Sequence, residues 1–407
     1  MMINKDKVFG GILLASGTAI GAGMLALPLS TANSGFIPSG FAFLVCWFFM
    51  TISALLLLEM NLRFSGDKDL ISMTHLTFGI FGKTIAWILY LLFLYTLIVA
   101  YLTGSSAWVL KTLEKFDLNV SPNVVMMSLI FIFGLIVFYG TVVVEHMNRY
   151  LMYGLILTYV MLIVSASPSI EMAKLSQIDL THLPPTLPLI ITAFGFAPII
   201  PSLTQYLNRD VLALRYVVVL GGLIPLVIYL LWEWVALGII PLSGVNSFET
   251  LIQHHDDGTG VAVALEHITG NAWITQSSRW FTLFAIFTSL LGVSLALFHF
   301  LADGLGIQKK TGLHRLFLLG CIYTPPLLVV LFYPSAFSHV LSLAGILAAL
   351  LFGIFPALMV WCTRYSRDKK FERGYQVFGG KPMLMTVIIF FCYIVYVEIT
   401  NCIICRS

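Results

Sequence analysis

The sequence GTAIGAGMLALP, residues 17–28, lies inside the first long apolar segment of the chain. Its three glycines, Gly17, Gly21 and Gly23, each disfavour a helix by roughly 1 kcal/mol relative to alanine, and Pro28 ends the stretch. A segment of this composition is a poor continuous helix. We therefore expect the backbone to be interrupted here.

The composition indicates that this interruption lies within a membrane. The chain has 407 residues, of which 59% are hydrophobic and 10% charged, and its mean hydropathy is +0.96. Soluble domains carry about 25% charged residues, so we predict an all-α polytopic membrane protein that is surrounded by the lipid bilayer. The small net charge of +3 argues against a nucleic-acid partner.

Segments of about 20 apolar residues, the length that crosses a bilayer, occur eleven times in the sequence. They fall at roughly 8–31, 37–60, 84–110, 123–143, 148–167, 186–206, 213–237, 279–301, 315–333, 338–361 and 382–404. Of the 22 Lys and Arg residues, 17 lie on the predicted side of the N-terminus and 5 on the other. The positive-inside rule then predicts a cytoplasmic N-terminus and a periplasmic C-terminus.

A second interruption is expected in the sixth segment, which contains TAFGFAPIIPS with Gly195, Pro198 and Pro201. Proline removes a backbone donor and clashes with the preceding turn. The first and sixth segments occupy matching places in helices 1–5 and 6–10, and because five is odd the two halves would have opposite orientations. Paired interruptions of this kind are typical of inverted-repeat secondary transporters with a site at mid-membrane.

This pattern predicts a first repeat at residues 1–167, an inverted repeat at 168–363, and a cytoplasmic basic loop with an accessory eleventh helix at 364–407. Close helix packing through a small-xxx-small pattern is the alternative reading of Gly17 and Gly21. Unwound backbone inside a membrane needs partners. A free N–H at the start of a half-helix suits a carboxylate, free carbonyls suit an ammonium group, and glycine lets a ligand approach the main chain.

The quoted interruptions belong to a longer series of motifs. In order along the chain these are GTAIGAGMLALPLSTANSGF, LLLLEMN, AYLTGSS, MNRYLM, AFGFAPIIPSL and FHFLADGLG. The series resembles the bacterial hydroxy/aromatic amino acid permeases of the amino acid–polyamine–organocation superfamily, and the tyrosine-specific permeases most. The resemblance implies a five-plus-five inverted repeat with discontinuous helices 1 and 6. It also implies proton-coupled uptake of an aromatic amino acid across the bacterial inner membrane by alternating access.

The resemblance also implies which residues bind the substrate. These are Ile20, Gly21, Ala22, Gly23, Tyr101, Phe194, Gly195 and Phe196. Two positions depart from the family pattern. Relatives commonly carry a histidine after the FGF triplet, where this chain has Ala197, and a lysine early in the fifth helix, where it has Gly154 and Leu155. Both departures leave the proton route and the exact substrate open.

Acidic residues within membrane spans are expensive and functional by default, and three of them are candidates for proton coupling. Glu59 ends the second segment, where a proton carrier and a helix-end carboxylate that reaches interfacial water are equally favoured. Glu233 lies between two tryptophans, which favour an interfacial carboxylate over a proton carrier. For Asp303 a structural contact with a basic residue such as Arg149 is favoured over proton carriage.

Two hydroxyl residues of the eighth segment, Thr288 and Ser289, form a candidate ion site opposite the first interruption. The favoured alternative is that both hydroxyls bond to their own helix. The HHDD run at residues 254–257 is interpreted as a solvated loop, so no metal site is expected. No phosphate-binding loop occurs in the sequence, and no cofactor other than the coupling ion is expected.

These observations predict a symporter for an aromatic amino acid, with tyrosine weakly preferred over tryptophan and a proton as the coupling ion. A permease for serine or another neutral amino acid, or one driven by sodium, is the alternative. A polytopic membrane enzyme is a remote alternative, because no H-E-x-x-H or Ser/His/Asp pattern is present. The sequence leaves the oligomeric state open.

Overall fold

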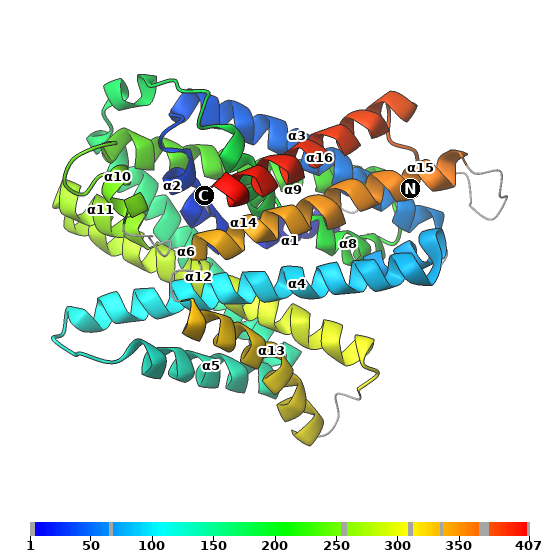
Figure 1. The fold of residues 1–407 in the computed structure, drawn as a ribbon, viewed down its shortest axis with the longest axis horizontal. Helices are drawn as coiled ribbons and strands as arrows, with labels where there is room; N and C mark the ends of the chain where they lie inside the picture. The colour runs from blue at the N-terminus through cyan, green and yellow to red at the C-terminus, as the bar shows by residue number, and fades with distance from the viewer. Residues whose placement is uncertain are drawn as a thin grey trace.

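The computed structural model of the chain describes residues 5–64, 68–253, 259–307, 312–333, 337–365 and 374–404. The HHDD run at 254–257 lies outside these residues. The described chain forms a bundle of long helices joined by short connections (Figure 1). Within these described residues, ten helices are long and apolar enough to cross a membrane, and a bent pair, Lys5–Ala19 with Ala22–Thr31, makes an eleventh span if it is counted as one. The predicted all-α polytopic membrane fold is thus confirmed.

The first part of the bundle runs from the N-terminus to residue 166. Its elements are α1 (Lys5–Ala19), the 3-10 turn η1 (Ala22–Ala26), α2 (Leu27–Thr31), α3 (Phe36–Arg63), α4 (Leu70–Glu114), α5 (Pro122–Tyr139) and α6 (Thr141–Ala166). The range Leu70–Glu114 begins well before the predicted residue 84 because a short helix precedes the long one, and the Asp69 carboxylate caps this short helix by accepting from the Ser72 N–H at 2.8 Å. At Gly79, with φ of 70° and ψ of −160°, the backbone leaves the helical conformation, and this kink separates the short helix from the long helix that follows.

The second part of the bundle follows three short 3-10 turns, η2 to η4. Its elements are α7 (Leu187–Ala193), η5 (Ala197–Ile199), α8 (Ile200–Tyr206), α9 (Val211–Ile239), α10 (Phe248–Gln253), α11 (Gly260–Thr269), α12 (Ala272–Gly304), α13 (Gly312–Phe332), α14 (Phe337–Ala348), the π-helical turn η6 (Ala349–Ile354), α15 (Phe355–Tyr365) and α16 (Gly380–Ile404). The fifth span begins at Thr141 rather than near 148, because the turn before it is at Gly140, with φ of 104°.

The two predicted interruptions are both present. The helix pair Lys5–Ala19 and Ala22–Thr31 is bent by 48° at its break. In the sixth span, residues 194–196 and the turn η5 separate α7 from α8. Each break therefore leaves backbone groups outside the regular helix, within a segment of spanning length.

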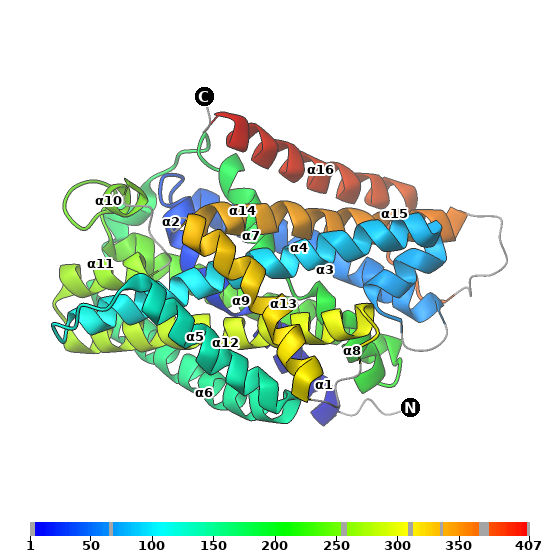
Figure 2. The same cartoon turned by 60° about the horizontal axis from the view of Figure 1, so that its bottom comes forward.

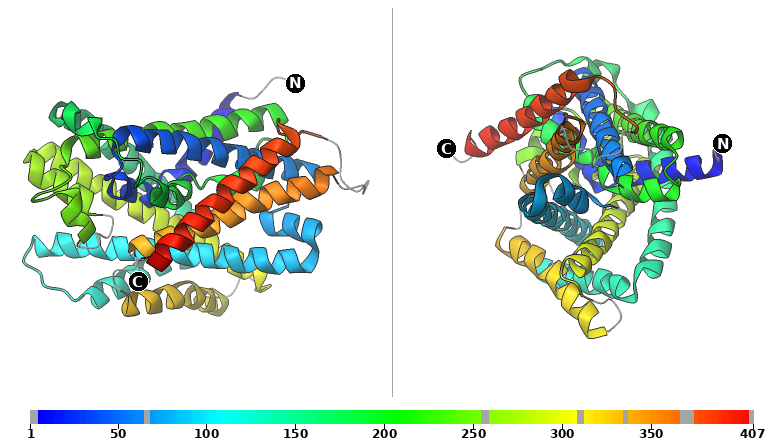
Figure 3. Two further views of the ribbon diagram at one scale, coloured as in Figure 1. Left: turned by 45° about the horizontal axis from the view of Figure 1, so that its top comes forward. Right: turned by 90° about the vertical axis from the view of Figure 1, so that its right-hand side faces the viewer.

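The long helices place these breaks inside the bundle. α9 packs along α1 and α3, and α12 packs along α6 and α4. The C-terminal helix α16 lies on the outside, against α14, η6 and α15 (Figure 2), and the end-on view shows it at the periphery (Figure 3). The sequence-based division into two inverted repeats and an accessory helix stays a prediction.

Candidate functional site

The first break is held open by contact with α12. α1 ends at Ala19, and Gly21 is extended, with φ −165° and ψ −159°. The next amide, that of Ala22, donates to Ser289 Oγ at 2.8 Å. A Cβ atom added to Gly21 would collide with that same hydroxyl. A side chain at position 21 would therefore push the Ser289 hydroxyl away from the Ala22 amide. Within the residues that the structure describes, the Gly21 amide donates no hydrogen bond.

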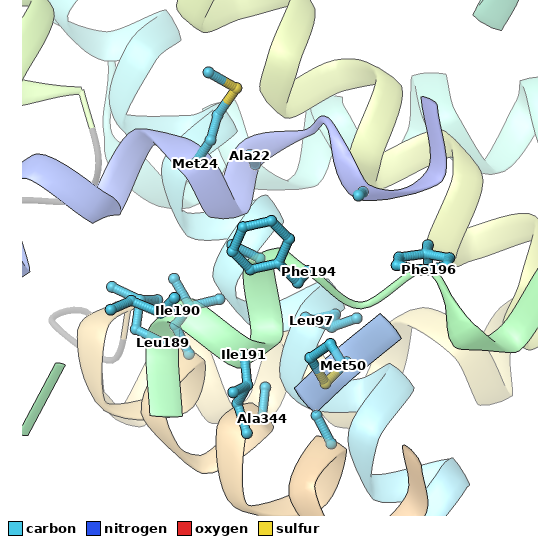
Figure 4. Packing of buried hydrophobic residues seen from close by; sticks show 14 of the residues in the cluster. Ala22, Met24, Met50, Leu97, Leu189, Ile190, Ile191, Phe194, Phe196 and Ala344 are labelled. Carbon is cyan, nitrogen blue, oxygen red and sulfur yellow. The ribbon is translucent and has the colours of Figure 1, made fainter. Parts of the chain in front are cut away.

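The second break is a tight local turn. The Gly195 amide donates to the Thr192 carbonyl at 3.1 Å, and the Phe196 amide donates to the Phe194 carbonyl at 2.8 Å. These short-range bonds replace the regular helical pattern. Phe194 and Phe196 are both 0% exposed, and Figure 4 shows their rings on either side of the interruption, with Phe194 facing the ribbon that carries Ala22.

The two breaks meet at one buried hydroxyl. Tyr229 Oη on α9 lies 2.8 Å from the Ala19 carbonyl oxygen and 2.8 Å from the Ala193 carbonyl oxygen. These two carbonyls belong to the last residues of α1 and α7. A Cβ atom on Gly23 would lie 3.6 Å from Ala193 Cα, so the η1 backbone also passes beside the end of α7. The structure thus brings together the breaks that the sequence placed far apart.

Tyr101 on α4 joins this site. It is buried, and its phenol is close enough to that of Tyr229 to interact electrostatically. Tyr229 itself was missed by the sequence analysis. It is one tyrosine in the apolar run VIYLLWEW, and no local pattern in that run indicates a contact with residues more than 30 positions away.

Glu233 lies one turn beyond Tyr229 on the same helix and is 0% exposed. Its carboxyl group therefore does not reach water as a snorkelling side chain would, and the adjacent Trp232 is also buried. The Thr31 hydroxyl at the end of α2 contacts one carboxyl oxygen of Glu233 and, at 2.7 Å, the Leu27 carbonyl. The other carboxyl oxygen has no hydrogen-bond partner among the described residues. Glu233 is thus a buried acid next to the first broken span.

Glu59 is also fully buried, but it is surrounded by positive charge. Its carboxylate accepts from Arg63 at 2.7 Å, from Arg364 Nε at 2.7 Å and from the Val377 amide at 2.8 Å. Of the two equally favoured readings, a carboxylate that reaches interfacial water does not fit this burial. Glu59 ties the end of α3 to the end of α15 and to the segment before α16.

Of the other polar candidates, Asp303, Thr288 and Ser289, it is Ser289 that contacts a break among the described residues. Asp303 is exposed at the end of α12, and Arg149 pairs with Glu145 at 2.9 Å instead of with it. The Thr288 hydroxyl donates to the Phe284 carbonyl of its own helix at 2.8 Å, as the favoured alternative stated. Ser289 donates to its own helix too, but it also reaches the first break.

The two positions that depart from the family pattern are both buried. Ala197 and Leu155 are each 1% exposed. Neither residue supplies an ionisable group. Any proton carried through the described core must therefore use other side chains, and Glu233 is a buried carboxyl that contacts the end of α2, the second half of the first broken span.

Comparison with known proteins agrees with the motifs. The model of the tryptophan/tyrosine permease family matches residues 4–398. Tyrosine-specific transport system 1 of Haemophilus influenzae is 32% identical over 386 residues, covering 94% of each chain. The tryptophan-specific transport protein of the same organism is 31% identical over 406 residues, covering 95% of this chain and 94% of its own. Glutamine transporter 2 of Aliivibrio fischeri is 27% identical, covering 94% and 97%.

The spans and the relatives together define a multi-pass membrane transport protein rather than an enzyme. Within that class, the chain belongs to the tryptophan/tyrosine permease family. The resemblance predicted from its motifs is confirmed.

Proposed function

We propose that this protein imports an aromatic amino acid, tyrosine in the first instance, across the bacterial inner membrane by proton-coupled symport with alternating access. The N-terminus would be cytoplasmic and the C-terminus periplasmic. The observation that carries the proposal is the meeting of the two breaks at Tyr229, whose hydroxyl lies 2.8 Å from the last carbonyl of α1 and 2.8 Å from that of α7.

These breaks offer both kinds of group that an amino acid needs. The carbonyls of Ala19 and Ala193 are acceptors for an ammonium group, and the amides of Gly21 and Ala22 are donors for a carboxylate. Free amides at the start of a half-helix favour an anion. The zwitterionic part of the substrate would therefore bind main-chain groups, which every amino acid can satisfy equally.

Selection among amino acids must then come from the side chains around the breaks. The Phe194 ring packs against Tyr229 with ring centroids 5.0 Å apart, and Phe196 and Tyr101 are buried nearby. Aromatic rings favour tilted and edge-on contacts with one another. This lining supports an aromatic substrate, and relatives named for tyrosine and for tryptophan support the same substrate class.

Glu233 is the proposed proton carrier. The Thr31 hydroxyl has one proton, and donating it to the Leu27 carbonyl leaves its oxygen as an acceptor for a protonated Glu233 carboxyl. An ionised carboxylate at a buried site without a cation would be strongly destabilised. While it is buried, the Glu233 carboxyl would therefore keep its proton. It would release the proton when water reaches α2 and α9.

The energy available for coupling is sufficient for a scavenging permease. One charge that crosses about 100 mV gains roughly 2.3 kcal/mol, and one pH unit adds about 1.4 kcal/mol. The sum of roughly 3.7 kcal/mol supports about 500-fold accumulation for each proton carried.

The test is uptake into proteoliposomes that contain the purified full-length protein. Labelled tyrosine, tryptophan, phenylalanine, serine and glutamine would each be offered with an imposed proton gradient or an imposed sodium gradient. We expect tyrosine to accumulate with the proton gradient and to be released by a proton ionophore. Accumulation that requires sodium and ignores the ionophore would overturn the proton assignment. Uptake of glutamine or serine alone would overturn the aromatic assignment.

A further inference from the structure

The hydroxyl group of Tyr229 faces two acceptors with a single proton. Its oxygen is 2.8 Å from the Ala19 carbonyl and 2.8 Å from the Ala193 carbonyl, and the whole side chain is 0% exposed. A phenol has one O–H group, so it donates fully to only one carbonyl at a time. Among these three groups there are therefore two acceptors and one donor.

The position of the Tyr229 oxygen is also the position that an ammonium nitrogen would need. Hydrogen bonds from N–H to carbonyl oxygen span about 2.7–3.2 Å, and Oη meets that condition for both carbonyls at once. An ammonium group has three protons and a positive charge, so it satisfies both carbonyls together and more strongly.

We propose that Tyr229 is an internal occupant of the substrate's ammonium subsite, a role that rests on the proposed function. In the empty protein its hydroxyl joins the ends of α1 and α7. The arriving ammonium group takes the two carbonyls and displaces the hydroxyl, and the hydroxyl returns when the substrate leaves. Tyr229 is thus a positioning residue that sets the affinity for the amino group by competing with it.

Two features of α9 suit a side chain that has to move. Pro225 lies one turn before Tyr229 inside the helix, and proline removes a main-chain hydrogen bond there. The Tyr229 ring also packs against Phe194, with an interplanar angle of 59°. Displacing the phenol would therefore shift the aromatic lining, so that arrival of the amino group is sensed by the residues that contact the substrate side chain.

The test compares Tyr229→Phe with a matched control, Tyr159→Phe, in the full-length protein in lipid nanodiscs. The Tyr159 hydroxyl also donates to a main-chain carbonyl, that of Ile228, at 2.8 Å, and not to either of the helix-end carbonyls at the breaks. Equilibrium binding of labelled tyrosine would be measured for both. Because the internal competitor is removed, we expect the Kd of Tyr229→Phe to fall about 3- to 10-fold, the worth of one hydrogen bond. The Kd of Tyr159→Phe should stay within about 2-fold of the wild-type value.

A ligand without an amino group separates this role from general loosening of the site. We would measure displacement of labelled tyrosine by 3-(4-hydroxyphenyl)propionate, which keeps the ring and the carboxylate. Its inhibition constant should be the same for the wild-type protein and Tyr229→Phe, because this ligand never competes with the hydroxyl. An equal gain for both ligands would overturn the proposal.

A second variant covers the case in which Tyr229→Phe does not fold. Incorporation of 3-fluorotyrosine at position 229 keeps the shape of the side chain and makes the phenol a stronger donor. The Kd for tyrosine should then rise, the opposite sign to Tyr229→Phe. An unchanged or higher Kd in Tyr229→Phe, with normal binding by the wild-type protein, overturns this inference alone. If the wild-type protein binds neither tyrosine nor tryptophan, the proposed function fails and the inference fails with it.

Discussion

Two buried carboxyl groups of this transporter, Glu59 at the end of α3 and Glu233 in α9, have opposite surroundings. Both are 0% exposed. Glu59 accepts hydrogen bonds from Arg63, from Arg364 and from a main-chain amide. Glu233 contacts the hydroxyl of Thr31 and leaves one oxygen without a partner in the described chain. The first group is held by two cations and a main-chain amide, whereas the second has a single neutral partner among the described residues.

A similar contrast between charged and neutral partners separates the main chain at the end of α3 from the main chain at the two breaks. At the end of α3, Arg209 donates to the carbonyls of Leu62 and Phe64, each at 2.9 Å. At the two breaks, by contrast, neutral hydroxyls bond to peptide groups that lie outside the regular helices. Tyr229 contacts the carbonyls of Ala19 and Ala193, and Ser289 accepts from the Ala22 amide. Hydrogen bonds from charged side chains hold a helix end strongly in one arrangement, whereas a single neutral hydroxyl can be replaced by a ligand. On the proposed function, we therefore expect the end of α3 to stay in place during transport and the breaks to open.

The largest effect on this comparison should come from Glu59→Ala. Removing one partner of a buried ion pair leaves the other charges uncompensated and destabilises a protein by about 3–5 kcal/mol. We expect a marked fall in the melting temperature of the purified protein, followed by intrinsic fluorescence. The control is Glu145→Ala, which breaks an exposed pair with Arg149, where the side chains are 62% and 54% exposed, and which should change stability by at most about 1 kcal/mol. Equal melting temperatures for the two variants would show that the buried pairs of Glu59 stabilise the protein no more than the exposed pair of Glu145.

The next largest effect is expected for Glu233→Gln. The amide keeps the size of the side chain but cannot carry a proton, so proton-driven accumulation should fall from as much as about 500-fold to none. Exchange of internal for external tyrosine needs no net proton movement and should continue. Both rates would be measured in the same proteoliposome preparation.

The control for this variant is Glu59→Gln at equal amounts of folded protein, which should retain accumulation. Normal accumulation by Glu233→Gln would show that the unpaired carboxyl is not the carrier. Loss of accumulation by Glu59→Gln alone would reverse the roles that we assign to the two acids.

A smaller effect, on affinity, should separate Gly21→Ala from Gly23→Ala. A Cβ atom on Gly21 would collide with Ser289 Oγ, whereas one on Gly23 would make an ordinary contact at 3.6 Å with Ala193 Cα. Overpacking of this kind costs about 1–3 kcal/mol, so the Kd for tyrosine should rise roughly 5- to 150-fold for Gly21→Ala. Gly23→Ala should bind within about 3-fold of the wild-type protein. Similar values for the two variants would mean that the substrate does not approach the first break at Gly21.

The breaks could be predicted from the sequence because their cause is local. Glycine and proline disfavour a helix wherever they occur. The composition of residues 17–28 and of the run around Gly195 was therefore enough to predict that each helix is interrupted there. The spans could be predicted for the same reason, since apolar length is a local property. Their ends were less certain where a turn glycine such as Gly140 decided the boundary.

The ranking of the acids could not be predicted, because their partners lie far away in the sequence. Arg364 and Val377, which fix Glu59, are 305 and 318 residues away from it. Two tryptophans beside Glu233 are typical of a membrane interface, but that carboxyl is buried and contacts Thr31 at the end of α2. Tyr229 was missed because a tyrosine in an apolar helix carries no sign of which carbonyls it will meet.

The smallest effect should come from Ser289→Ala. This variant tests whether the Ser289 hydroxyl is a hydrogen-bond acceptor that a substrate can replace or a ligand of an ion. Its loss leaves the Ala22 amide without the 2.8 Å bond, so the empty protein should lose about 1 kcal/mol of stability. A bound substrate carboxylate would then restore more of the melting temperature than it does in the wild-type protein. Thr288→Val is the matched control, because that hydroxyl bonds only within α12. If Ser289→Ala instead abolished a sodium dependence of uptake, Ser289 would be an ion ligand, and the first break would belong with the fixed, charged regions of the protein.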